Sequence, residues 1–281
     1  MPNLRRKTFL SVKIALCALL LALLSFPFIG NLHAQNPINI ARERLDQAKQ
    51  DYSFQFSKYE DCRKQYITDR SAYITFQTAT SKNTAFLTTK DCLSKVYDVY
   101  VSYLRYIKEQ GNVFTWNKND SEKETIFKSL DDEITYFQVN KSKVGDLQTL
   151  ESSVTYSAEL KTHITKTTYQ IIQKALATYE VAESEAALED FVNMADILRK
   201  FTLSKIDQNQ YASFIANWDS EISDIRQEAE SNNTRARNTL STFKPQIYDT
   251  GAINSITSIT KKTKTELIRS KSIFAEILKL I

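Results

Sequence analysis

A seven-residue spacing of apolar side chains constrains this chain more than any other feature. Over residues 38–73 an apolar residue, most often tyrosine, occupies every seventh position: Ile38, Leu45, Tyr52, Tyr59, Tyr66 and Tyr73. Intermediate positions, three residues after members of this set, are also apolar: Ala41, Ala48, Cys62 and Phe76. A repeat of this period is typical of a long helix that packs lengthwise on a neighbour. We predict that the helix begins at Asn36-Pro37, a capping residue followed by proline.

Residues that interrupt helices are scarce, with four glycines and four prolines in 281 residues. Beyond residue 34 they are reduced to Gly111, Gly145, Gly251, Pro37 and Pro245. Average usage would supply several times more of both, and a sheet protein with many tight turns would need them. We therefore predict an all-α fold, either an elongated antiparallel helical bundle or a set of long helical hairpins, with heptad-like striping.

A second striped helix is predicted after a polar turn at residues 78–83. Its apolar residues are again seven apart, with two others between them: Phe86, Leu93, Tyr100 and Ile107, then Val96 and Leu104. Gly111 stands where this helix is expected to stop, because glycine readily adopts the left-handed conformation just past a helix end. Residues 36–111 should therefore form an antiparallel hairpin.

Further helices are predicted over residues 120–281, with breaks at four places: Gly145-Asp146, a kink near Glu183-Ser184, Asp207-Gln208-Asn209, and Pro245. The helix over residues 211–243 has the most regular stripe. Asn232 lies on that stripe, where it either sets the register or marks an exposed end. The helical part, 35–281, is thus one bundle or a hairpin, 36–111, joined to the helices of 120–281.

The first 34 residues have the layout of a secretory signal peptide. A basic stretch without acids (Arg5, Arg6, Lys7 and Lys13) precedes an apolar run from Ile14 to Gly30, and Ala34 offers a cleavage point. The rival interpretation is an uncleaved membrane anchor over residues 10–30, since roughly 20 apolar residues span a bilayer. Cys17 lies within the run rather than at its end, so lipid attachment is not expected. We expect a secreted or extracytoplasmic protein, membrane-anchored if the segment is retained.

Removal of this segment changes the meaning of the net charge. The whole chain has 37 basic and 33 acidic residues, a formal charge of +4. All four excess positive charges precede Ala34, so the remainder is neutral. Nucleic-acid binding requires clustered basic charge, and no nucleic-acid partner is expected.

Catalytic and metal-binding motifs are absent from the sequence. His163 is the one histidine beyond residue 34, and Glu159 lies one turn before it. A metal site in a bundle usually takes Glu-x-x-His from two helices, so a structural histidine is expected. The acidic run Asp131-Asp132-Glu133 is typical of a solvated helix face. We predict no catalytic, cofactor or metal residues, and we do not expect an enzyme.

Two cysteines remain beyond the N-terminal segment, Cys62 and Cys92, on or beside the stripes of the predicted hairpin. Their midpoint is residue 77, close to the predicted turn, so antiparallel helices bring them to nearly the same height. An exported chain could join them in a disulfide. The alternative is two small buried thiols. A turn centred nearer residue 80 would shift the cysteines beyond the narrow Cα–Cα range of a disulfide.

Two surface features each allow a contact interpretation and a packing interpretation. Phe114 and Trp116 lie in a predicted loop, where an exposed tryptophan could anchor a partner; more often such residues close the end of a bundle. The lysine-rich helix from about residue 252 to the C-terminus could lie on an anionic membrane. Its Ser and Thr content on the apolar side favours a place in the bundle.

The function expected from these features is that of an exported, non-enzymatic helical protein with a structural or interaction role. It would act through a protein partner or through self-association of helical surfaces, and no cofactor is expected. The second hypothesis is a bundle that binds an apolar or aromatic small ligand among its 14 tyrosines and 15 phenylalanines. A sizeable internal cavity would favour that hypothesis, and a filled core would count against it.

Overall fold

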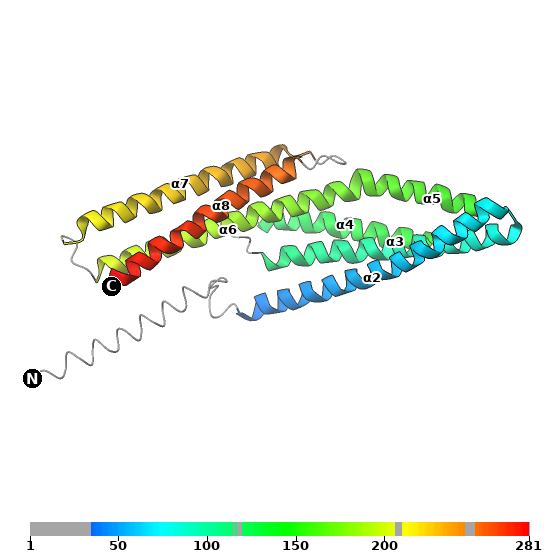
Figure 1. The fold of residues 1–281 in the computed structure, drawn as a ribbon, viewed down its shortest axis with the longest axis horizontal. Helices are drawn as coiled ribbons and strands as arrows, with labels where there is room; N and C mark the ends of the chain where they lie inside the picture. The colour runs from blue at the N-terminus through cyan, green and yellow to red at the C-terminus, as the bar shows by residue number, and fades with distance from the viewer. Residues whose placement is uncertain (1–34, 115, 117–119, 206–209, 245–250, 281) are drawn as a thin grey trace, which may run out of the picture.

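The computed structural model describes residues 35–114, 116, 120–205, 210–244 and 251–280. Its elements are α2 (Gln35–Phe76), α3 (Ala79–Val113), α4 (Asp120–Val144), α5 (Leu150–His163), the π-helical turn η1 (Ile164–Thr168), α6 (Tyr169–Leu203), α7 (Ala212–Thr242) and α8 (Gly251–Leu280). Within these ranges there is no strand, and the helices run largely along one long axis (Figure 1). The predicted all-α, elongated, antiparallel fold is confirmed.

The α2–α3 hairpin turns at Gln77 and Thr78, with Gln77 at a φ of 50°. The predicted turn at residues 78–83 is therefore wrong, because α3 already begins at Ala79. The Thr78 hydroxyl accepts the Ser81 backbone N–H at 3.1 Å, and the Ser81 hydroxyl accepts the Thr78 backbone N–H at 3.1 Å. This reciprocal cap satisfies two free N–H groups at the start of a helix, so the polar residues start α3 instead of forming the turn.

The second helix does not end at Gly111, which corrects the sequence-based prediction. α3 continues to Val113, and Gly111 is buried within its last turn. A Cβ atom at this position would lie 2.6 Å from the Tyr179 ring and 2.7 Å from the Phe127 ring. The glycine is therefore required for the close approach of two aromatic rings to the backbone, and it terminates nothing.

Replacing Gly111 by alanine is expected to destabilise the protein by about 1–2 kcal/mol. The overpacking of a buried site costs about 1–3 kcal/mol, and the gain in helix propensity from Gly to Ala offsets up to about 1 kcal/mol of this. Denaturant unfolding measures the difference. Gly145→Ala is the matched control, since the nearest atom to its added Cβ is the Ser142 carbonyl oxygen at 3.3 Å. Equal stability of the two variants would contradict the packing role of Gly111.

The chain from α5 to α6 is interrupted only by η1, a single π-helical turn. The predicted kink near Glu183-Ser184 is wrong, because α6 is continuous from Tyr169 to Leu203. The Ser184 hydroxyl is fully buried and donates to the Asn233 side-chain oxygen on α7 at 2.6 Å. The polar residue is thus used for a contact between helices, and it leaves the backbone of α6 regular.

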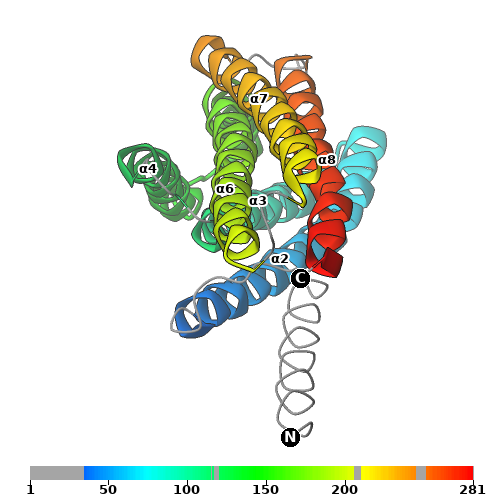
Figure 2. The same ribbon diagram turned by 90° about the vertical axis from the view of Figure 1, so that its left-hand side faces the viewer.

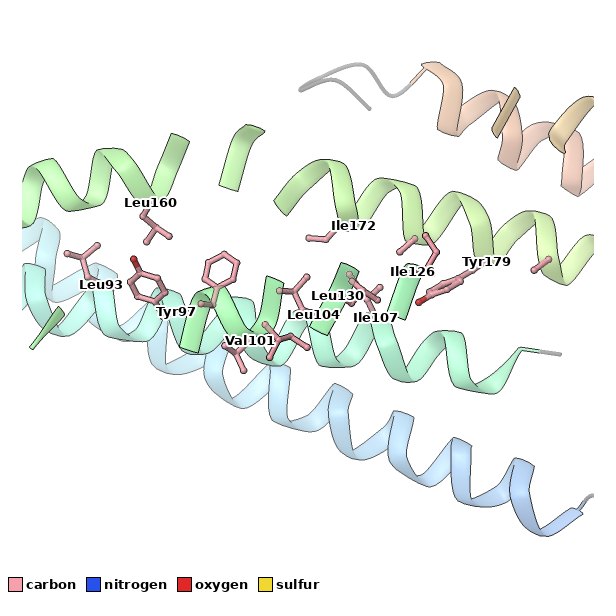
Figure 3. Close-up of a cluster of buried hydrophobic side chains, with 14 of the residues drawn as sticks. Leu93, Tyr97, Val101, Leu104, Ile107, Ile126, Leu130, Leu160, Ile172 and Tyr179 are labelled. Carbon is pink, nitrogen blue, oxygen red and sulfur yellow. The ribbon is translucent and has the colours of Figure 1, made fainter. Parts of the chain in front are cut away.

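Three groups of buried side chains meet on α6, and the smallest joins Ala177 and Val181 to residues of α7 and α8. The first group joins α3, α4, α5 and the first half of α6 (Figure 3), and includes Leu104, Leu130, Phe137 and Tyr179. The second joins α6 to α7 and α8 through residues such as Phe191, Trp218, Ile225 and Ile277. Figure 2 shows α6 in the middle, with α4 on one side and α7 and α8 on another. A helix in this position must be apolar on more than one face.

The C-terminal pair, α7 and α8, resolves two alternatives left by the sequence. Asn232 is 6% exposed, so it lies inside the stripe and does not mark an exposed end. The lysine-rich α8 packs against α7 and α6 and buries Thr260 and Thr263 completely, which is the bundle position. No helix in the described ranges is long and apolar enough to cross a membrane.

Several predictions concern parts of the chain outside the described residues. They are the signal peptide with cleavage after Ala34, the alternative anchor at 10–30, the Asp207-Gln208-Asn209 turn, and the end of a helix at Pro245. These stay predictions from the sequence.

Candidate functional site: a tyrosine-rich groove

The two predicted cysteine partners face each other across the α2–α3 hairpin. The sulfur atoms of Cys62 and Cys92 are at bonding distance, 1.98 Å, and their Cα atoms are 5.6 Å apart. That Cα separation is typical of disulfides. The two cysteines lie at the same level along the hairpin because the first residue of the turn, Gln77, is halfway between them in the sequence. Both side chains are buried.

Phe114 and Trp116 lie where α3 approaches α6. Trp116 is 9% exposed, and its indole N–H donates to the Gly111 carbonyl oxygen at 2.8 Å. Its ring meets the Tyr179 ring edge-on, and the half-buried Phe114 packs on the same tyrosine. These contacts close the end of the first core. Binding of a partner at these two residues stays a prediction, and Phe114 has the larger free surface.

His163 belongs to a buried polar contact that the sequence did not predict. Its Nε2 atom lies 2.8 Å from Oε1 of Glu133 on α4, and the Thr168 hydroxyl donates to the same oxygen. The Tyr136 ring stacks on the imidazole with a centroid distance of 3.6 Å. The contacts hold η1 against α4, so the structure gives His163 a packing environment, as expected.

Glu133 corrects the prediction that the acidic run of α4 is a solvated face. It is 4% exposed, whereas Asp131 and Asp132 are exposed and form ion pairs with Lys108 and Lys128. Successive residues of a helix are rotated by about 100°, so three adjacent acids cannot share one face. No group of three or more metal-ligating side chains occurs within the described ranges.

An open groove with α3 as its floor is available to a ligand. Two adjoining hollows, of about 520 and 360 Å³, share Tyr59, Leu93, Val96 and Ser157. Together they define what we call the tyrosine groove, lined by Tyr52, Phe56, Tyr59, Arg63, Tyr66 and Ile67 of α2, Thr89, Cys92, Leu93, Val96, Val99, Tyr100 and Tyr103 of α3, Val154, Ser157, Leu160 and Lys161 of α5, and Ile164 of η1.

The groove exists because α2 and α5 both pack on α3 but make little contact with each other. Figure 1 shows α3 between them. The tyrosine stripe of α2, which includes Tyr52, Tyr59 and Tyr66, is consequently only half-buried. The Tyr52 ring contacts the Tyr103 ring of α3 at a centroid distance of 5.0 Å, and Tyr52, Tyr59 and Tyr66 all line the groove.

The groove combines apolar surface with neutral hydroxyl groups and two positive charges. Tyrosine hydroxyls are protonated at neutral pH, and burial raises the pKa values of Tyr100 and Tyr103 further above the ordinary value. Arg63 and Lys161 are the charged lining residues, and both are exposed. Neither forms an ion pair with any residue that the structure describes.

The stripe of α2 is visible in the sequence, but the groove is not. The available signal was the amino-acid type. Tyrosine, with an apolar ring and a polar hydroxyl, suits a position that is partly buried and partly exposed to solvent. A fully buried seam would more commonly carry Leu, Ile or Val. Large apolar residues at the rim, Ile67 and Val154, are more than half exposed.

The fold and the groove together define an all-α antiparallel bundle with an open, aromatic surface channel. Comparison with protein-family models, with curated proteins and with solved structures gives no match for this chain. The groove and the sequence are therefore the features that bear on function.

Proposed function

We propose that this chain is an exported, non-enzymatic helical protein that has an interaction role and binds a protein partner in the tyrosine groove. The observation that carries the proposal is the tyrosine stripe of α2, which is half-buried and faces the groove between α2 and α5. Tyrosine is among the residues that contribute most to binding at protein interfaces. A contiguous apolar surface left open on a helical bundle is typical of an interaction site.

Export is supported by two independent features. The N-terminal sequence has the basic, apolar and small-residue order of a signal peptide. The sulfur atoms of Cys62 and Cys92 are at disulfide distance, and disulfides persist mainly in oxidising compartments outside the cytosol.

The second candidate function, binding of an apolar or aromatic small ligand, is favoured by the aromatic lining alone. Small-ligand sites usually enclose most of the ligand surface, about 70–90%. Here the hollows form a channel that is open to solvent along α2 and α5. An open channel suits an extended occupant better than a compact small molecule, so we favour a protein partner.

A photoreactive phenylalanine at Ser157 is expected to crosslink a partner in intact cells. Ser157 is an exposed helical residue that lines both hollows of the groove. Ser272 is the matched control, because it is also exposed and helical but lies on α8. We expect a discrete adduct of higher mass from position 157 and none of that mass from position 272.

Adducts of the same mass from both positions, or none from position 157, would contradict the proposed role of the groove. Fractionation of the same cells tests export: recovery of the chain in the cytosol with an intact N-terminus would contradict that part. Protein identification of the adduct separates a partner from a second copy of the chain.

A further inference from the structure

We infer that the tyrosine groove binds one amphipathic α-helix of a partner protein, about three to four turns long, with an apolar face bordered by carboxylates. This inference rests on the proposed function and specifies the chemistry of the partner. It follows from the shape of the groove, from its apolar lining and from the two charges on its walls.

The length of the groove suits a short helix, and its two walls are themselves helical. The α2 wall extends from Tyr52 to Ile67, and the α5 and η1 wall from Val154 to Ile164. At 1.5 Å per residue these stretches are about 22 and 15 Å long, the length of a helix of roughly 10–15 residues. A helix laid between two helices on a third completes a four-helix arrangement, a common way for a bundle to cover its apolar faces.

The lining offers anchor positions along this length. Leu93, Val96 and Tyr100 form an apolar floor, and Leu93 and Val96 line both hollows. Phe56 and Ile67 on the α2 wall are 40% and 51% exposed, and Val154 on the opposite wall is 57% exposed. A partner helix with apolar residues at spacings of three and four would bury these side chains.

Two positive charges on the groove walls indicate that the partner helix carries negative charges. Arg63 lies on the α2 wall and Lys161 on the α5 wall, and every other lining residue is uncharged at neutral pH. Since both cations lack an ion-pair partner among the described residues, carboxylates on the two flanks of a bound helix would meet opposite charges on both sides. Charge-assisted pairs of this kind add specificity to an apolar contact.

Two synthetic peptides of 18 residues test the inference against the full chain. Both carry leucine at spacings of three and four on one face; one has glutamate at the flanking positions and the other has lysine. Both are checked for equal helicity by circular dichroism, and binding is measured by fluorescence anisotropy at low and high salt. We expect the glutamate peptide to bind at least about tenfold more tightly at low salt, and the difference to shrink at high salt because exposed charges are screened.

The double variant Arg63→Glu/Lys161→Glu is expected to reverse this preference. The control is Arg44→Glu/Lys262→Glu, which makes the same change in net charge at two exposed helical positions outside the groove. The control should keep the preference of the unmodified chain. Circular dichroism of each variant confirms that the helices are retained, and exposed surface substitutions of this kind usually change stability by about 0.5 kcal/mol or less.

Several results would overturn the inference. They are equal binding of the two peptides, no binding of either, and an equal loss of preference in the two double variants. Sedimentation supplies a further one: self-association of the unmodified chain that the groove variant abolishes would make a second copy the occupant. The photoreactive residue at position 157 could still capture a partner while the chain binds the glutamate and lysine peptides equally well. In that case the proposed function stands and the acidic helix is rejected.

Discussion

Replacing Phe137 by alanine is expected to destabilise the protein by about 3–5 kcal/mol, the usual cost of deleting a buried aromatic ring. The Phe137 side chain is fully buried on α4. Its ring stacks on Tyr100 at a centroid distance of 4.9 Å and meets Tyr97 and Tyr136 edge-on at 5.8 and 5.5 Å. Loss of the ring would leave a cavity among three aromatic side chains, and packed helices collapse into such a space only in part.

Denaturant unfolding checks this prediction, with Val139→Ala as the control two residues further along α4. Val139 is 51% exposed, so its truncation should change the free energy of unfolding by about 0.5 kcal/mol or less. Because Tyr100 is also part of the groove floor, Phe137→Ala should weaken binding of the glutamate peptide as well. A Phe137 variant as stable as the Val139 variant would show that the aromatic cluster does not hold α3 to α4.

Replacing both cysteines by serine is expected to cost about 3–4 kcal/mol, from the loss of a crosslink between residues 30 apart. The effect should be concentrated in α2. That helix packs chiefly on α3, and Cys62 is its one buried apolar residue within the described range. Amide hydrogen exchange should therefore become faster along α2 while the centre of α6 keeps its protection.

Reduction of the unmodified chain with dithiothreitol should reproduce the change seen in the double serine variant. A thiol count under denaturing, non-reducing conditions provides the independent check, with no free thiol expected from Cys62 and Cys92. Two free thiols, or identical exchange of α2 in both forms, would contradict the role of this crosslink.

The parts of the fold that the sequence predicted are those set by local periodicity. The seven-residue stripes gave α2 and α3, and the pair Gly145-Asp146 correctly marked the end of α4. The alignment of Cys62 with Cys92 followed from simple arithmetic on a hairpin, and it succeeded because the turn lies at residues 77 and 78 rather than nearer 80.

The parts that the sequence did not predict depend on residues distant in the chain. Gly111 looked like a helix end because its actual reason, the approach of Tyr179, is 68 positions away. Ser184 looked like a kink because its partner Asn233 is on another helix. The groove was missed for a similar reason: a stripe shows that a helix has an apolar face, but not how much of that face its neighbours cover.

The continuity of α6 has a mechanical consequence. Its 35 residues contribute to the core shared with α3 and α4 and also to the core shared with α7 and α8. Rotation of one half against the other would require breaking backbone hydrogen bonds in α6 or opening one core, so the helix offers no hinge. The two ends of α6, roughly 50 Å apart, are consequently expected to move as one unit, so a partner in the groove would not change the angle between the two cores through α6.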